Sequence, residues 1–249
     1  MRLTHLFSAA ALACTVALPA SALDLTNMSD EERAMFHEEV RAYLMDQPQV
    51  IMEAVNQLEA HQQQEAAQAD LDLVSDNAEA LFNDGYSYVG GNPDGDITLV
   101  EFLDYRCGYC RKAHTEVAKM LETDGNIRLI VKEFPILGEQ SVLASRFAIA
   151  VKLAAGDDAY KAINDSLMTF PGELSMISLN RLGNTFGLDM AAVEAQMNGP
   201  EVVEQLAKTK ELAQILRITG TPTFVLQDEM LRGYLPYDQL MMIVNDKRG

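Results

Sequence analysis

The tetrapeptide Cys107-Gly108-Tyr109-Cys110 constrains the fold most, because it joins an apolar run, residues 97–103, to a segment with helical spacing. Two cysteines this far apart on the first turn of a helix lie close enough to bond. Unpaired backbone N–H groups and the helix dipole favour a thiolate there. The pattern therefore predicts thiol–disulfide exchange, with Cys107 as the exposed nucleophile of lower pKa and Cys110 as the resolving thiol.

The first 22 residues have the pattern of a secretory signal peptide. Arg2 precedes an apolar run, residues 6–18, and Ala20-Ser21-Ala22 fits a small-x-small cleavage site. The run is short for a membrane span. We predict cleavage after Ala22 and export, with an uncleaved anchor or a lipoprotein as the alternatives.

Export would leave the CGYC pair as the only cysteines, since the third, Cys14, lies in the leader. The loop that Cys107 and Cys110 would close is too small for a disulfide to add much stability. Half a zinc site is the alternative, but the chain has no second cysteine pair to complete four ligands. The pair is therefore predicted to be reactive, with no resident metal and no cofactor.

The net charge of the chain limits the classes of partner that it can bind. The chain carries a formal net charge of −18. Such an acidic protein is repelled by phosphate backbones and by anionic membrane surfaces. We therefore expect no nucleic acid partner.

The segment after the leader, residues 23–83, has a helical pattern almost throughout. Ser29 and Glu32 form a capping-box pattern, and Pro48 separates two helical stretches. Residues 28–65 combine a narrow apolar seam with a polar remainder, so the helices have little to bury alone. This favours self-association, with a solvated helical linker as the alternative.

Residues 84–249 are predicted to form one domain. The expected elements are strands at 86–89, 96–104 and 126–134 with a helix at 109–122 before the third strand, a helical block at 139–217, strands at 223–226 and 230–235, and a terminal helix. A β-α-β half and a later β-β-α half around one sheet are typical of thioredoxin. The predicted fold class is α/β, a thioredoxin fold with an inserted helical domain, preceded by an N-terminal helical arm.

A second candidate site element is Thr221-Pro222, directly before the strand at 223–226. A proline after a β-branched residue at this place is a candidate cis peptide bond, which is rare and usually functional. Beside CGYC, such a loop would present the Thr221 backbone to an extended substrate. A trans proline at a strand start is the alternative.

Glu101 interrupts an otherwise apolar strand six residues before Cys107. Burial would raise its pKa and let it exchange protons with Cys110. A solvent-facing acid at the strand end is the alternative. Lys132, on the next strand, is a candidate to pair with Glu101 or approach the thiolate, against an ordinary strand lysine.

Three separated blocks, residues 101–113, 132–138 and 220–224, resemble the DsbA family of periplasmic thiol–disulfide oxidoreductases in that family's order. The resemblance covers about residues 86–249. It implies a periplasmic enzyme that exchanges disulfides at Cys107 and Cys110. It also implies protein substrates with cysteines or disulfides and a membrane thiol-redox partner.

Residues 28–65 resemble the N-terminal extension of the ScsC branch of that family, which is linked to copper tolerance. This implies a homo-oligomer, a trimer, formed through those residues, and disulfide isomerase activity. Gly108-Tyr109 departs from the Pro-His dipeptide of strongly oxidising DsbA members, so no imidazole stabilises the Cys107 thiolate. We therefore predict a less oxidising pair. A protein that binds Cu(I) through the same thiols, or a simple dithiol oxidase, is the alternative.

Overall fold

The computed structural model describes residues 26–249, so the predicted signal peptide and its cleavage site lie outside the described residues. The chain divides into two units, Met1–His61 and Gln62–Gly249. Within residues 26–249, every helix is too short or too polar to span a membrane.

The described part of the first unit is helical. It holds α1, Asp30–Asp46, and the first part of α2, Gln49–Asp76. The predicted capping box is present: the Ser29 hydroxyl accepts from the Glu32 N–H at 3.3 Å, and the Glu32 carboxylate accepts from the Ser29 N–H at 2.9 Å. No residue of α1 is buried. Large apolar side chains exposed on the two helices are Met35, Phe36, Val40, Tyr43, Met45, Ile51, Met52, Val55 and Leu58.

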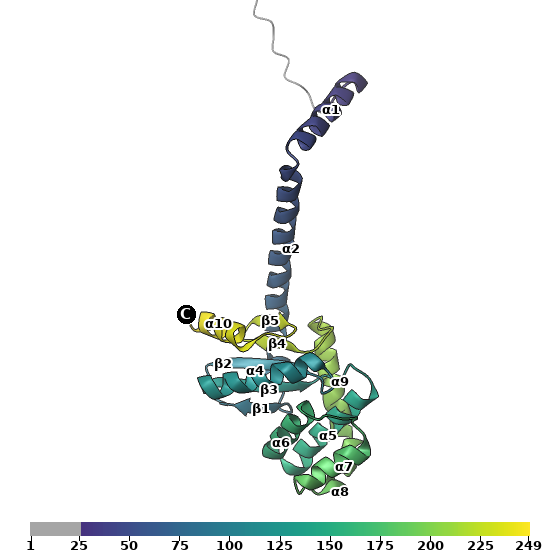
Figure 1. The fold of residues 1–249 in the computed structure, drawn as a ribbon, viewed down its shortest axis with the longest axis vertical. Helices are drawn as coiled ribbons and strands as arrows, with labels where there is room; N and C mark the ends of the chain where they lie inside the picture. Colours follow the sequence, from purple (N-terminus) through teal and green to yellow (C-terminus); the bar gives the residue numbers. More distant parts are fainter. Residues whose placement is uncertain (1–25) are drawn as a thin grey trace, which may run out of the picture. The chain divides into compact units, whose positions relative to one another are not determined.

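The second unit is built on one five-stranded sheet with the order β1-β3-β2-β4-β5 (Figure 1). Its strands are β1 Tyr88–Gly91, β2 Ile97–Leu103, β3 Ile127–Glu133, β4 Thr223–Leu226 and β5 Glu229–Arg232. β2 and β3 pair in parallel, and the other neighbours are antiparallel. The predicted α/β arrangement, with a helical block between two halves of one sheet, is confirmed.

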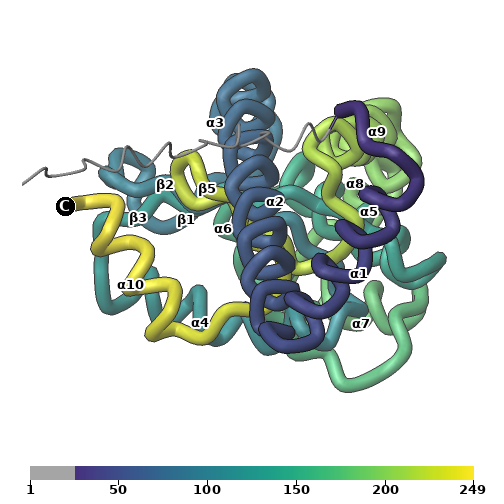
Figure 2. The backbone as a smooth tube through the Cα atoms, turned by 90° about the horizontal axis from the view of Figure 1, so that it is seen from above, coloured from purple at the N-terminus to yellow at the C-terminus, as the bar shows by residue number. Residues whose placement is uncertain are grey.

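Helices cover both faces of the sheet. On one face, α4, Gly108–Asp124, and α10, Tyr237–Arg248, run beside each other (Figure 2). On the other face, Val74 of α2, Leu81 of α3, Ala78–Phe82, and Leu212 of α9 pack in one cluster with β2 and β3. The end of α2 therefore belongs to the compact second unit.

The helical block consists of α5, α6, α7, α8 and α9, at Glu139–Ala155, Asp157–Met168, Met176–Thr185, Met190–Met197 and Pro200–Ile215. The first four gather to one side of the sheet (Figure 1). Apolar side chains of α5 and α6 continue the core formed by α4 and the sheet. The block is therefore packed on the sheet domain and shares its core.

The first and last strands depart most from their predicted ranges, 86–89 and 230–235. β1 begins at Tyr88, because the Asp84 carboxylate accepts from the N–H groups of Tyr86 and Ser87 and holds them in a turn. β5 ends at Arg232, because Gly233 adopts a φ of 93° that an extended strand does not allow. In both places a local turn replaces strand pairing.

Candidate active site

Cys107 lies at the junction between β2 and α4. It is the N-cap of α4, with extended backbone angles of φ −75° and ψ 116°, and its Sγ accepts from the Cys110 N–H at 3.4 Å. Both cysteines are free thiols. The predicted place at the start of a helix is confirmed, but the predicted exposure is wrong, because Cys107 keeps only 7% of its surface.

The loop before β4 covers the Cys107 sulfur. β4 pairs with β2, with Thr223 opposite Phe102, and this pairing brings Thr221-Pro222 beside the cysteine. The Cys107 thiol donates to the Thr221 carbonyl oxygen at 3.1 Å. The Thr221–Pro222 peptide bond is cis, as predicted.

Glu101 is buried within β2, as predicted, and keeps 2% of its surface. Its Oε1 has no hydrogen-bond partner among residues 26–249. The pKa of Glu101 is raised to about 7, chiefly by burial; His114 opposes the shift, and the Glu133 carboxylate adds to it. The site therefore holds a carboxyl group that can bind and release a proton near neutral pH.

Cys110 is the less accessible of the two thiols. It lies one turn inside α4 and is fully buried. Burial raises the pKa of the Cys110 thiol well above its ordinary value, and the charges of Glu101 and Cys107 act in the same direction. Cys110 therefore needs a proton acceptor before it can act as a thiolate, and Glu101 is a base close enough to influence it.

Lys132 does not take part in this site. In the parallel register Lys132 lies opposite Phe102, whereas Glu101 lies opposite Val131, so the two side chains point to opposite faces of the sheet. The Lys132 ammonium forms a buried ion pair with Asp84 and donates to the Ala80 carbonyl at 2.8 Å. The predicted pairing of Lys132 with Glu101 or the thiolate is wrong, because a one-residue offset along a strand reverses the face.

Asp104 is a structural residue of the site that the sequence reasoning missed. It is fully buried, and its carboxylate accepts from the backbone N–H of Arg106 at 2.8 Å, Ile136 at 2.8 Å and Leu137 at 3.0 Å. Its own carbonyl accepts from the Cys107 N–H at 3.0 Å. The bond to the N–H two residues ahead is an Asx turn, and an Asp directly after a strand is the local signal for one.

We expect Asp104→Asn to lower the free energy of unfolding by about 2 kcal/mol. The amide retains one oxygen for Arg106 but places an NH₂ group where Ile136 and Leu137 donate. Both of those residues are partly exposed, so water offsets part of the loss. Urea denaturation of the reduced protein measures the change. Unaltered stability would show that the carboxylate does not hold the loop.

Glu133 anchors a second buried network that no sequence pattern indicated. Its carboxylate accepts from the Tyr105 hydroxyl at 2.6 Å, the Tyr160 hydroxyl at 2.6 Å and the Ser145 hydroxyl at 2.7 Å. Burial raises the pKa of Glu133 to about 7, although the three donors oppose the shift. The network joins the end of β3 to α5, to α6 and to the segment that leads to Cys107.

Comparison with known proteins gives two family matches. Residues 98–244, more than half of the chain, match the DSBA-like thioredoxin domain. Residues 32–67 match the copper resistance protein ScsC N-terminal domain. The two matched stretches do not overlap, so the arm and the sheet domain match different family models.

Solved structures resemble the chain over most of their length. A thioredoxin-like oxidoreductase from Silicibacter pomeroyi is 39% identical, with a TM-score of 0.65, and the match covers 68% of this chain and 96% of that one. Proteus mirabilis ScsC in a transitional conformation is 26% identical, with a TM-score of 0.65, and the match covers 89% of this chain and 97% of that one.

A longer curated protein also matches. The Na(+)/H(+) antiporter NhaA 3 of Salinispora tropica is 26% identical over 151 residues, which are 61% of this chain. The match takes in only 23% of the antiporter, so the chain corresponds to about a quarter of that protein's length.

Proposed function

Because the chain belongs to the family of DSBA-like thioredoxin domains, we propose that it is a thiol–disulfide oxidoreductase acting on protein substrates through Cys107 and Cys110. The resemblance of the sequence to this family and to its ScsC branch is confirmed. The observation that carries the proposal is the position of the Cys107 sulfur. It caps α4 and lies 3.1 Å from the Thr221 carbonyl oxygen, where a substrate backbone can be held.

The exchange proceeds in two steps that balance in atoms and electrons. The Cys107 thiolate attacks a substrate disulfide, forms a mixed disulfide and releases one substrate thiolate, which takes up a proton. The Cys110 thiolate then attacks the Cys107 sulfur, and the second substrate thiolate leaves. Two electrons pass from the protein dithiol to the substrate, and the reverse sequence oxidises a substrate dithiol.

Glu101 and the Thr221-Pro222 loop have distinct roles in this proposal. Glu101 accepts the proton of Cys110 before the second step, because the Cys110 pKa is raised by burial. The Thr221 main chain pairs with an extended substrate segment beside Cys107. Tyr109, which is 65% exposed, adds apolar surface next to the reacting sulfur.

More specifically, we propose that the protein isomerises disulfides in the periplasm. Gly108-Tyr109 supports a pair that is less oxidising than a Pro-His site, and the ScsC match over residues 32–67 supports an oligomerising arm at residues 28–65. We propose a trimer in which several sites act on one misbridged substrate. A membrane thiol-redox partner maintains the pair. The match to a copper resistance protein domain supports a link to copper tolerance, for which we propose Cu(I) binding by Cys107 and Cys110.

Two assays test the activity. The reduced protein is expected to accelerate the reduction of insulin disulfides by dithiothreitol, and no acceleration over dithiothreitol alone would refute an oxidoreductase. Refolding of scrambled ribonuclease distinguishes an isomerase from a dithiol oxidase. Recovery of ribonuclease activity supports an isomerase, whereas oxidation of reduced ribonuclease without rescue of the scrambled form identifies a dithiol oxidase.

The oligomer proposal predicts a specific result for α1. Phe36 and Val40 are exposed and one helical turn apart, so both lie on one face. The double variant Phe36→Asp/Val40→Asp is expected to be a monomer by light scattering, because each apolar side chain contributes about 1.5–3 kcal/mol when buried and a buried carboxylate adds a further cost. Isomerase activity should fall while insulin reduction remains.

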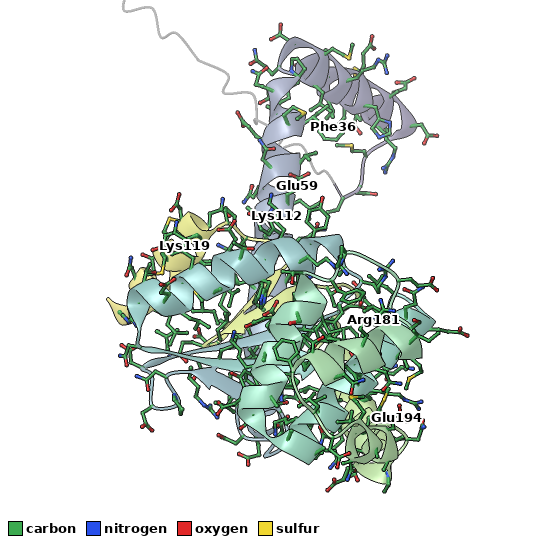
Figure 3. The ribbon with its side chains drawn as sticks, turned by 60° about the horizontal axis from the view of Figure 1, so that its bottom comes forward. Phe36, Glu59, Lys112, Lys119, Arg181 and Glu194 are labelled. Carbon is green, nitrogen blue, oxygen red and sulfur yellow. The ribbon has the colours of Figure 1, made fainter. Side chains whose placement is uncertain are left out.

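The control for this variant is Glu59→Gln, an exposed position on α2, which Figure 3 marks together with Phe36. Its mass should equal that of the unaltered protein. A double variant with unchanged mass would place the interface elsewhere. A monomeric unaltered protein would remove the multi-site argument for isomerisation.

A further inference from the structure

A cavity of about 340 Å³ lies between α4, α6 and strands β1 to β3. Exposed residues form part of its lining, namely Ala118 and Glu122 of α4 and Lys161 of α6. Glu101, buried in β2, lines the same cavity. The cavity therefore connects the protein surface with the carboxyl group that serves Cys110, and its volume is sufficient for several water molecules.

His114 lines this cavity as well. It lies one turn of α4 beyond Cys110, and its side chain keeps 20% of its surface. Its Nε2 is 3.1 Å from Oδ1 of Asp165 on α6, and Asp165 also pairs with Lys161. A carboxylate at Nε2 favours the proton on that nitrogen, which leaves Nδ1 as the basic nitrogen of the neutral ring.

We propose that this cavity is the proton path of the exchange reaction and that His114 passes protons between Glu101 and solvent, held in place by Asp165. The inference rests on the proposed function. In the second step Cys110 gives its proton to Glu101 and forms the bond to the Cys107 sulfur. Glu101 then gives the proton to His114, which releases it to water at the rim, and the reverse reaction follows the same path.

The need for such a residue follows from burial. A carboxyl group that accepts a proton in every turnover must also lose it, and Glu101 keeps almost no surface of its own. Imidazole is the side chain that takes up and releases protons near neutral pH. His114 and the buried Glu101 line the same cavity, which reaches the exposed rim, and the charge of His114 acts to lower the pKa of Glu101.

The other charged groups near Glu101 do not offer the same route. Glu133, on β3, is held by three hydroxyl donors, and the cavity that it lines measures only about 10 Å³. Glu122 and Lys161 are at the exposed rim. Cys107 and Cys110 are the reacting thiols themselves. His114 alone of these groups places a partly buried imidazole inside the cavity.

The reagent 5,5′-dithiobis(2-nitrobenzoate) separates the two steps. Attack by Cys107 releases one coloured thiolate, and attack by Cys110 on the mixed disulfide releases the second. We expect His114→Ala to leave the first release unchanged and to slow the second about tenfold at neutral pH. Added imidazole should restore the second rate, because the vacated cavity admits it. His37→Ala, on α1, is the matched control.

A second variant tests whether the slower second step in His114→Ala is only a consequence of altered structure. His114→Gln keeps a polar side chain of similar length but cannot carry a proton, so it should be as slow as His114→Ala and unresponsive to imidazole. An unchanged second rate in both variants, or a slow rate that imidazole does not restore in His114→Ala, would overturn the proposal. A failure of the unaltered protein to release either thiolate would instead refute the proposed function.

Discussion

Cys107→Ser is expected to abolish disulfide exchange, and Cys110→Ser to leave the protein trapped as a mixed disulfide. Cys107 is the thiol at the helix N-cap beside Thr221, whereas Cys110 has no exposed surface from which to attack a substrate. A serine hydroxyl at either place cannot replace a thiolate. Without Cys110, release of the trapped substrate must wait for an external thiol.

The size of the effect follows from the intramolecular geometry. A well-placed internal nucleophile reaches an effective concentration of about 10⁵ M, so release in Cys110→Ser should slow by up to about 10⁸-fold at millimolar external thiol. Mass spectrometry after acid quenching should find one substrate thiol on each Cys110→Ser chain and none on Cys107→Ser. Adducts on Cys107→Ser but not on Cys110→Ser would reverse the two roles.

Glu101→Gln is expected to stabilise the reduced protein by about 3 kcal/mol at pH 8 and by almost nothing at pH 4. The pKa of Glu101 is raised from 4.5 to about 7 in the folded protein because the carboxyl group is buried. The folded state therefore holds this proton more tightly than the unfolded state does. The stability that the protonated Glu101 contributes is fully present below about pH 4.5, declines up to about pH 7 and is absent above it.

A pKa difference of one between the folded and unfolded states corresponds to about 1.4 kcal/mol. The rise from 4.5 to about 7 therefore sets the expected gain in the free energy of unfolding. Glutamine has the shape of the protonated carboxyl group, so it removes the cost of the buried charge without creating a void. Urea denaturation at both pH values measures the difference. Glu194→Gln, at an exposed position of α8, should change stability at neither pH.

The same substitution should slow the second step of exchange, because an amide cannot accept the proton of Cys110. In the unaltered protein that step should become faster as the pH rises through about 7, where Glu101 loses its proton. A Glu101→Gln protein that is less stable at pH 8, or that keeps the full rate and pH profile of the second step, would contradict the role given to this residue.

Local patterns in the sequence were sufficient for several features of the site. The CGYC pattern placed Cys107 at the start of a helix, and the β-branched residue before Pro222 indicated the cis bond. The apolar residues around Glu101 indicated that it is buried in a strand. Each of these depends on a few neighbouring residues, whose backbone geometry repeats every two residues in a strand or every turn in a helix.

Contacts between distant segments were decided only by the tertiary structure. The Thr221 carbonyl reaches Cys107, which lies 114 residues earlier in the sequence, because β4 pairs with β2. Lys132 binds Asp84, which lies 48 residues away, instead of Glu101. The sequence by itself predicted the two thiols that we propose to react and the local structure that carries them. The tertiary structure decided which groups meet there, because periodicity specifies the direction of a side chain and not the distant segment that packs against it.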